Sequence, residues 1–215
     1  MKKIKVLHLT STRRGIGGVQ NLLLALGDKY DREHFEFFFC NFFDDARGKG
    51  SFPTALKEKG QKHIEISERS FWELPLLLFK LAKAIRREKF DIVHTHMLQA
   101  SIIGQMIAKF MHLPTILTRH YSDYVYRYKG RFYQWLDRLA AHLAEQIIAI
   151  SEGSKKILVE YDKVSPEKIS VIHNGIDLHK FDCLSTYLSL KHEFFQDGTQ
   201  IIGTVAELHP CKGHR

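Results

Sequence analysis

The sequence predicts an α/β fold in which an open parallel sheet carries helices on both faces. Two observations support this prediction. Strand-like and helix-like hydrophobic patterns alternate along the chain with short connections between them, which favours right-handed βαβ units. In addition, Phe35–Phe39 is apolar except at Glu36, and such a dense apolar run suits a strand that is buried on both faces of a parallel sheet.

The elements follow from hydrophobic spacing and end signals. A strand at Lys3–Thr10 ends in the loop Ser11–Gly18, and a helix begins near Val19. A short helix at Pro53–Lys59 is closed by Gly60. Further strands are expected at Phe35–Phe39, His63–Ile66, Asp91–His94, Thr115–Thr118, Gln146–Ile150 and Ile169–Ile172. Further helices are expected at Glu73–Arg87, Ala100–Met111, Phe132–Ala144, and from a Ser151 cap to Tyr161.

Composition indicates a globular protein without a membrane span. Of the 215 residues, 44% are hydrophobic and 26% charged, which argues against disorder. The apolar runs are far shorter than a bilayer requires, and the start of the chain lacks a signal-peptide core. The three dispersed cysteines fit neither a disulfide framework nor a zinc site. We therefore expect a cytoplasmic protein.

The net charge of +8 favours an anionic partner such as a nucleotide sugar, an acidic acceptor or a lipid surface. No helix-turn-helix, zinc-finger or RNA-recognition signature accompanies this charge, so nucleic acid is not expected as a partner.

Ligands of open α/β sheets bind beyond the carboxyl ends of the strands. Four such ends are polar or flexible: Ser11–Gly18, Thr95–Gln99, Arg119–Asp123 and His173–Asp177. Glycines before a helix allow backbone amides to approach a phosphate, although a plain strand-to-helix turn explains them too. The loop lacks the third glycine of a dinucleotide fingerprint.

Histidines mark two of these ends. His94 and His96 share one face of a strand, but no Asp, Glu or Cys at compatible spacing completes a metal site, so no metal is expected. His120 directly follows an apolar strand, where it can exchange a hydrogen bond with a ligand oxygen, or with its own loop.

Five motifs in order and spacing resemble glycosyl transferase family 4, whose members adopt the two-domain GT-B fold. Val171–Phe181 is similar to the segment that closes the first domain of that family. The other four motifs are the Gly17-Gly18 loop, Asp91–His96, Ile148–Glu152 and Ile201–Gly213. The resemblance implies that this chain is the N-terminal half of a GT-B fold. It implies an acceptor-side Rossmann-like domain at 1–181, an interdomain linker at 182–199, and the truncated start of a donor-binding domain at 200–215.

The resemblance also implies a function. It implies retaining transfer of a sugar from a nucleotide-diphosphate sugar to a glycan or lipid-linked acceptor, without an essential metal, in cell-envelope or polysaccharide biosynthesis. His120 corresponds to a catalytic-site histidine that contacts the donor. The other implied roles are donor phosphate binding for Gly17, Gly18 and Lys212, acceptor-side contacts for His96 and Gln99, and the interdomain turn for Asn174, Gly175 and Asp177.

Two departures from the family affect these implications. Glu207 stands where the family usually has an arginine beside the Lys-Gly loop, and a carboxylate there would oppose phosphate. The chain also ends before the motif of paired glutamates that holds the donor, and a strand at Gln200–Val205 would have unpaired edges. We therefore expect no transferase activity from residues 1–215 alone.

Residues 121–138 interleave aromatic with basic side chains, as does a bilayer-interface segment near anionic headgroups. The alternative for residues 121–138 is that the aromatic side chains pack against the sheet. For the helix Glu73–Arg87, packing of its apolar face against the sheet is favoured over membrane contact.

Three other functions stay open: a non-catalytic acceptor-binding half that needs a separate donor-domain chain, a GT-B sugar-nucleotide epimerase, and a dinucleotide oxidoreductase.

Overall fold

A computed structural model describes residues 2–12, 15–42, 51–66, 73–121 and 124–178. Its contacts divide the chain into two compact units, Met1–Gly175 and Ile176–Arg215. The fold described below belongs to the first unit. The predicted linker at 182–199, the strand at Gln200–Val205, Glu207 and Lys212 lie outside the described residues.

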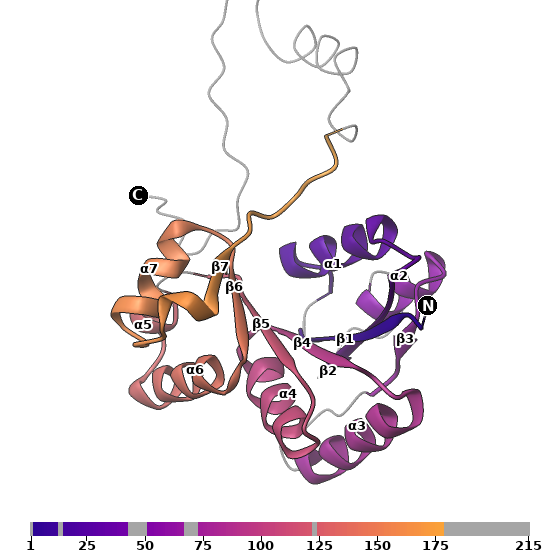
Figure 1. Ribbon diagram of the computed structural model, residues 1–215, viewed down its shortest axis with the longest axis horizontal. Helices are drawn as coiled ribbons and strands as arrows, with labels where there is room; N and C mark the ends of the chain where they lie inside the picture. The colour runs from indigo at the N-terminus through magenta and orange to yellow at the C-terminus, as the bar shows by residue number, and fades with distance from the viewer. Residues whose placement is uncertain (1, 13–14, 43–50, 67–72, 122–123, 179–215) are drawn as a thin grey trace, which may run out of the picture. The chain divides into compact units, whose positions relative to one another are not determined.

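The first unit is built on a parallel sheet of seven strands in the order β3-β2-β1-β4-β5-β6-β7 (Figure 1). The strands are β1 (Ile4–Ser11), β2 (Phe35–Phe42), β3 (His63–Ile64), β4 (Ile92–His96), β5 (Thr115–Arg119), β6 (Gln146–Ala149) and β7 (Ile169–Val171). The strand order reverses between β1 and β4, and such a switch point is where open α/β sheets bind ligands. The predicted α/β fold is confirmed.

Helices alternate with the strands. They are α1 (Gly18–Lys29), α2 (Phe52–Glu58), α3 (Leu74–Glu88), α4 (Leu98–Phe110), α5 (Tyr124–Tyr128), α6 (Arg131–Leu143) and α7 (Glu152–Glu160), with a 3-10 turn at Pro166–Lys168 before β7. The side chain of Ser151 accepts a hydrogen bond from the Ser154 amide at 3.1 Å, which confirms the predicted cap. Gly60 has φ +62° just past α2, which confirms its role as the closing residue.

Three elements differ from the prediction, and the first two differences have tertiary causes. β2 extends to Phe42 because its last residues pair with the end of β1. β4 extends past His94 to His96 because Thr95 and His96 pair with Leu117 and Thr118 of β5. Helix α5 was not predicted, since aromatic and basic residues obscure its short pattern. Pairing partners far away in sequence thus override local polarity.

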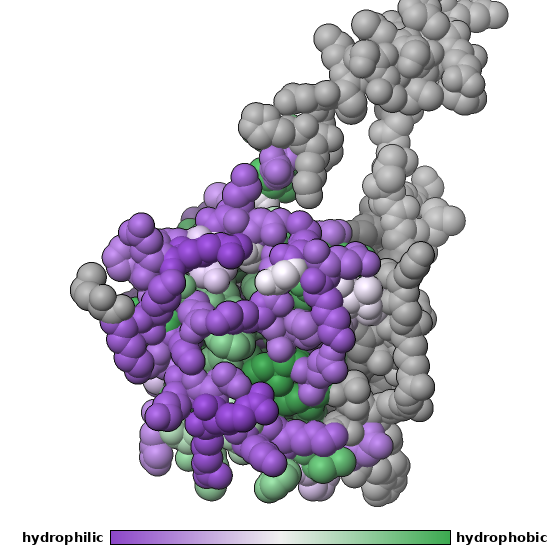
Figure 2. Space-filling view, turned by 90° about the vertical axis from the view of Figure 1, so that its right-hand side faces the viewer, coloured by the Kyte–Doolittle hydropathy of each residue, from purple (hydrophilic) through white to green (hydrophobic). Residues whose placement is uncertain are grey.

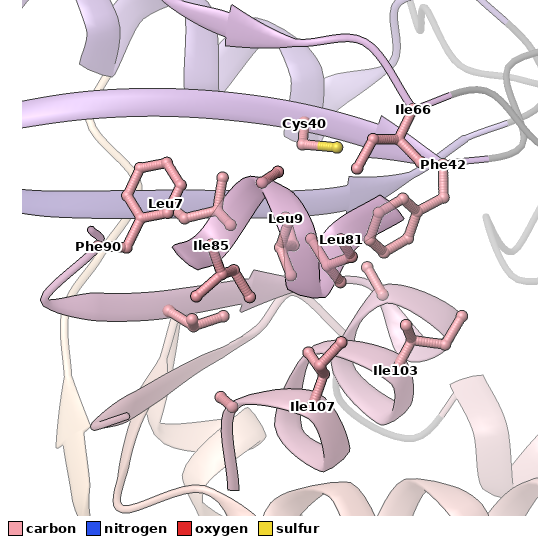
Figure 3. Close-up of a cluster of buried hydrophobic side chains, with 14 of the residues drawn as sticks. Leu7, Leu9, Cys40, Phe42, Ile66, Leu81, Ile85, Phe90, Ile103 and Ile107 are labelled. Carbon is pink, nitrogen blue, oxygen red and sulfur yellow. The ribbon is translucent and has the colours of Figure 1, made fainter. Parts of the chain in front are cut away.

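The sheet separates two sets of helices, with α1 and α2 on one side and α3, α4 and α6 on the other (Figure 1). Successive side chains of a strand point to opposite faces of the sheet, so the residues of β1 alternate between its two sides. Leu7 and Leu9 enter the larger core with α3 and α4, whereas Val6 and His8 point to the α1 side. Figure 3 shows that larger core, where the labelled side chains are Leu7, Leu9, Cys40, Phe42, Ile66, Leu81, Ile85, Phe90, Ile103 and Ile107.

The surface seen from the side of α1, α2 and α3 is mostly hydrophilic, and a few hydrophobic residues are visible between the hydrophilic ones (Figure 2). Among the described residues, none of the helices combines the length and apolar character that a bilayer crossing requires.

Candidate functional site

A cavity of about 390 Å³ lies on the α1 side of the sheet. Alternate residues of β1, β2, β4 and β5 form its floor, and Ile148 of β6 extends it. Leucines of α1 border it, as does the segment after β7, Ile172–Gly175. The polar residues of the lining are His8, His94, His96, Thr118, His120, His173 and Asn174.

Strand register explains why four histidines meet in this cavity. His8 of β1 pairs with His94 of β4 across the switch point. His96 is two residues further along β4, so it shares the face of His94, and it pairs with Thr118 of β5. His120 follows β5 by one residue and again shares that face. The cluster is therefore a consequence of sheet topology.

The histidine side chains contact one another directly. His8 Nδ1 lies 3.2 Å from His96 Nε2, and His96 Nδ1 lies 3.0 Å from His120 Nε2. In each pair one N–H donates to the other ring's lone pair. His94 Nε2 lies 2.7 Å from the Thr118 hydroxyl. Among the described residues, Nε2 of His8 is buried without a hydrogen-bond partner.

Burial keeps these imidazoles neutral near pH 7. It lowers the pKa of His94 to about 3, with a smaller effect of His120, and the pKa of His120 to about 4. Burial also holds the pKa of His8 and of His96 well below the usual value, and neighbouring histidines add to this. Each ring therefore offers one N–H donor and one lone pair, and the site has hydrogen-bonding capacity without charge.

The turn after β4 is strained. Met97, which precedes α4, has φ +69° and ψ 147°, a backbone region that residues with side chains seldom occupy and that costs about 1–3 kcal/mol. This residue directly follows His96. No local pattern predicts this strain, because methionine has no preference for such a conformation.

The predicted site residues separate into two groups. His96 and His120 lie in hydrogen-bonding distance, and Asn174 and Gly175 line the same cavity. The cavity lining does not include Gly17, Gly18 or Gln99. Asp177 belongs to the second unit, and Lys212 lies outside the part of the chain that the structure describes.

The two glycines nevertheless occupy the predicted place at the start of a helix. Gly17 is the N-cap of α1, and its amide donates to the Gln20 side chain at 3.1 Å. Gly18 is the first residue of α1, and a side chain added there would meet none of the described residues within 4 Å. Gln99 is exposed in the first turn of α4.

Arg119 belongs to the strand end Arg119–Asp123 that the sequence predicts at the ligand edge, but its side chain does not face the cavity. Arg119 is buried on the opposite face from Thr118 and His120, where its guanidinium lies 2.7 Å from Asp137 and 3.1 Å from Asp162. Tyr121 donates to Asp137 at 2.5 Å, and Tyr126 donates to Asp162. Arg119 therefore joins β5 to α6 and to the loop after α7, away from the cavity.

Sequence reasoning missed His8 as a member of the site. The two-residue alternation of His8 with Val6 and Thr10 places it on one face of β1. Its partner His96 is 88 residues away, so only the strand order brings the two together.

Comparison with known proteins agrees with this architecture. The family described as Glycosyltransferase Family 4 matches residues 16–180. An Escherichia coli protein, UDP-Gal:alpha-D-GlcNAc-diphosphoundecaprenol alpha-1,3-galactosyltransferase, is 34% identical over 108 residues, which cover 48% of this chain and 28% of that protein.

Solved structures share the fold. Anabaena HepE in complex with UDP superimposes with a TM-score of 0.71 at 19% identity, covering 88% of this chain and 50% of HepE. The UDP-GlcNAc 2-epimerase of Neisseria meningitidis gives a TM-score of 0.60 at 19% identity, covering 90% of this chain and 55% of that enzyme. The chain thus spans about half the length of the solved relatives it matches.

The family match covers more than half of the chain, and the sheet order and helix placement agree with half of a GT-B glycosyltransferase. The chain belongs to glycosyltransferase family 4.

Proposed function

We propose that this chain is the acceptor-side half of a retaining glycosyltransferase. The whole enzyme would transfer a sugar from a nucleotide-diphosphate sugar to a glycan or lipid-linked acceptor in cell-envelope or polysaccharide biosynthesis. The observation that carries the proposal is the cavity at the switch point, where His96 and His120 are in contact within a family 4 fold. The names of two relatives fit this class of substrates, since one structure contains UDP and one enzyme's acceptor is a lipid-linked diphosphate.

In this proposal His120 acts on the donor sugar as a neutral hydrogen-bonding group. Its pKa of about 4 leaves it uncharged at pH 7, so it does not neutralise the diphosphate. Because Nε2 faces His96, Nδ1 is the nitrogen that meets a sugar hydroxyl. A group already oriented by its neighbour loses little entropy when the ligand arrives.

The other predicted residues divide between the two substrates. His96, which lines the cavity, and Gln99, which is exposed at the start of α4, would contact the acceptor. Gly17, Gly18 and Lys212 would contact the donor diphosphate, where the backbone amides of a helix N-terminus and a cation stabilise developing charge. Asn174, Gly175 and Asp177 would form the turn between the domains.

Acceptor binding tests this proposal. We expect residues 1–215 to bind a soluble GlcNAc-diphosphate-lipid analogue, with imidazole NMR signals of His96 and His120 shifted on titration. His96→Phe should weaken binding about tenfold or more, whereas the exposed control Arg86→Met should leave it unchanged. Absence of binding by the unmodified chain would refute the acceptor-side assignment.

Catalysis separates the alternatives. Because the chain covers about half of its solved relatives, we expect it to show no sugar transfer by itself. Turnover by purified 1–215 would contradict that expectation. Conversion of UDP-GlcNAc to its 2-epimer would favour the epimerase. Transfer that appears only on adding a separate donor-domain chain would favour a non-catalytic acceptor-binding half.

We also propose a cytoplasmic location with peripheral contact to an anionic membrane through residues 121–138. Helix α6 exposes three aromatic side chains, Phe132 at 65%, Tyr133 at 45% and Trp135 at 57%. Exposed basic residues accompany them at Arg127, Lys129, Arg131 and Arg138. Aromatic rings beside cations suit the headgroup region of a bilayer.

Liposome flotation tests the membrane contact. We expect salt-sensitive binding to vesicles of phosphatidylglycerol and phosphatidylcholine, and a loss of about tenfold in binding for Phe132→Ser combined with Trp135→Ser. The matched control Leu76→Ser with Phe79→Ser removes exposed apolar residues from α3 and should bind as the unmodified chain does. If both double variants lost vesicle binding equally, the membrane contact could not be assigned to α6.

A further inference from the structure

We propose that His8, His94 and His96 form a binding site for one Zn²⁺ ion beside the cavity. One ring nitrogen from each of these residues lies within 4.8 Å of the other two. The three side chains are buried, with exposed fractions of 1%, 9% and 2%. Imidazole nitrogen is a preferred ligand of zinc, and three histidines are a sufficient protein ligand set.

The separations are close to those of a tetrahedral ion. Zinc binds imidazole nitrogen at about 2.0–2.1 Å, so two ligands of one tetrahedral ion lie about 3.4 Å apart. His8 Nδ1 and His96 Nε2 are 3.2 Å apart. One ring nitrogen of His94 lies within 4.8 Å of a nitrogen of each of the other two rings, and His94 lines the adjoining cavity of about 390 Å³.

The hydrogen bonds of two rings suit metal ligation. When His96 Nε2 holds the ion, its Nδ1–H donates to His120 Nε2, 3.0 Å away. When His94 uses Nδ1, its Nε2–H donates to the Thr118 hydroxyl at 2.7 Å. Ligating histidines regularly donate their second N–H to such a partner, which fixes the ring. His120 and Thr118 would thus orient the ligands.

His8 also has a buried ring nitrogen that lacks a partner. Within the described residues, His8 Nε2 has no hydrogen-bond partner although His8 is 1% exposed. A buried polar atom without a partner costs about 1–3 kcal/mol. Coordination through Nε2 would give this atom a partner, whereas coordination through Nδ1, which faces His96, would leave it as a buried N–H. The fourth position of the ion would face the cavity and be open to water or to a substrate oxygen.

This site departs from the expectation drawn from sequence. His94 and His96 alone lacked a third ligand at compatible spacing, and the parallel pairing of β1 with β4 supplies one. The inference rests on these side chains and does not depend on sugar transfer.

Metal titration of residues 1–215 tests the site. After removal of metal with EDTA and desalting, we expect one equivalent of Zn²⁺ to bind, and Co²⁺ to give the intense visible absorption of a tetrahedral complex. Long-range ¹H–¹⁵N spectra of the imidazoles should shift for His8, His94 and His96 on adding Zn²⁺. Since these spectra use the unmodified chain, they do not depend on how any variant folds.

Matched variants assign the ligands. His8→Phe, His94→Phe and His96→Phe retain an aromatic ring, and each should lower the affinity by more than about 100-fold. His120→Phe, which removes only the orienting partner, should lower it by about 10–100-fold. His112→Asn removes an exposed imidazole at φ +55°, which Asn tolerates, and should have no effect. Unshifted signals of the three buried histidines, or equal binding by all variants, would overturn the proposal.

Discussion

At the scale of single residues, the buried charge of Arg119 is the most consequential feature outside the cavity. Its side chain is 1% exposed, and both of its carboxylate partners, Asp137 and Asp162, are buried as well. Burial opposes charge on the guanidinium, but Tyr121 and the two carboxylates raise the pKa of Arg119 overall. Burial also raises the pKa of Asp137. The network therefore stabilises the fold only while all its members are present.

Arg119→Met tests this network. Removing one partner of a buried pair leaves uncompensated charge, so we expect the free energy of unfolding to fall by about 3–5 kcal/mol. Arg86→Met, an exposed arginine of α3, should change it by less than about 0.5 kcal/mol. Urea denaturation of both variants gives the comparison, and equal stabilities would show that the pair contributes nothing.

The same residues show what sequence can and cannot predict at this scale. The positions of His96 and His120 at strand ends follow from local pattern, and both line the cavity. Arg119 is next to His120 in sequence and was grouped with it, yet alternation along β5 sends its side chain to the opposite face. Its partners Asp137 and Asp162 belong to other elements, so their pairing has no local signal.

At the scale of elements, the close packing of α4 on the sheet depends on a glycine. A side chain at Gly104 would meet Thr95 Cγ2 at 2.5 Å and Leu9 Cδ1 at 2.8 Å. Thr95 and Leu9 are fully buried on adjacent strands. Glycine is unfavourable inside a helix by about 1 kcal/mol relative to alanine, and here the close approach of α4 explains its presence.

Gly104→Ala should therefore destabilise the protein although alanine favours the helix. Overpacking a core costs about 1–3 kcal/mol, which exceeds the helix gain or offsets it. The control Gly153→Ala in α7 meets only ordinary contact at 3.7 Å and should gain up to about 1 kcal/mol. Thermal unfolding should rank Gly104→Ala below Gly153→Ala, and the reverse order would refute close packing as the cause.

At the scale of the whole molecule, the alternating pattern along the chain predicts the parallel sheet and its helical layers, because periodicity is a local property. Strand order is not local. The reversal between β1 and β4 places His8 opposite His94, and this pairing could not be read from a pattern in which the two are far apart. The sequence thus predicts the edge of the sheet where a ligand binds, whereas the histidine cluster at the switch point is visible only once the strand order is known.

Acid pH should destabilise the metal-free protein through this cluster. Burial lowers the pKa of His94 to about 3 and of His120 to about 4, against about 6.5 in the unfolded chain. A depressed pKa contributes stability that is complete above pH 6.5 and is lost as pH falls toward the folded values, because the unfolded chain binds more protons. Each such histidine lowers the free energy of unfolding by about 1.4 kcal/mol per pH unit in this window.

Urea denaturation in EDTA between pH 6.5 and 4.5 measures the effect. With two such histidines we expect a slope of about 3 kcal/mol per pH unit or more, since burial lowers the pKa of His8 and of His96 in the same direction. His120→Phe should reduce the slope by about 1.4 kcal/mol per pH unit. A stability that stays constant across this range would mean that the folded and unfolded chains bind protons equally, so the pKa values of the buried imidazoles would not be lowered.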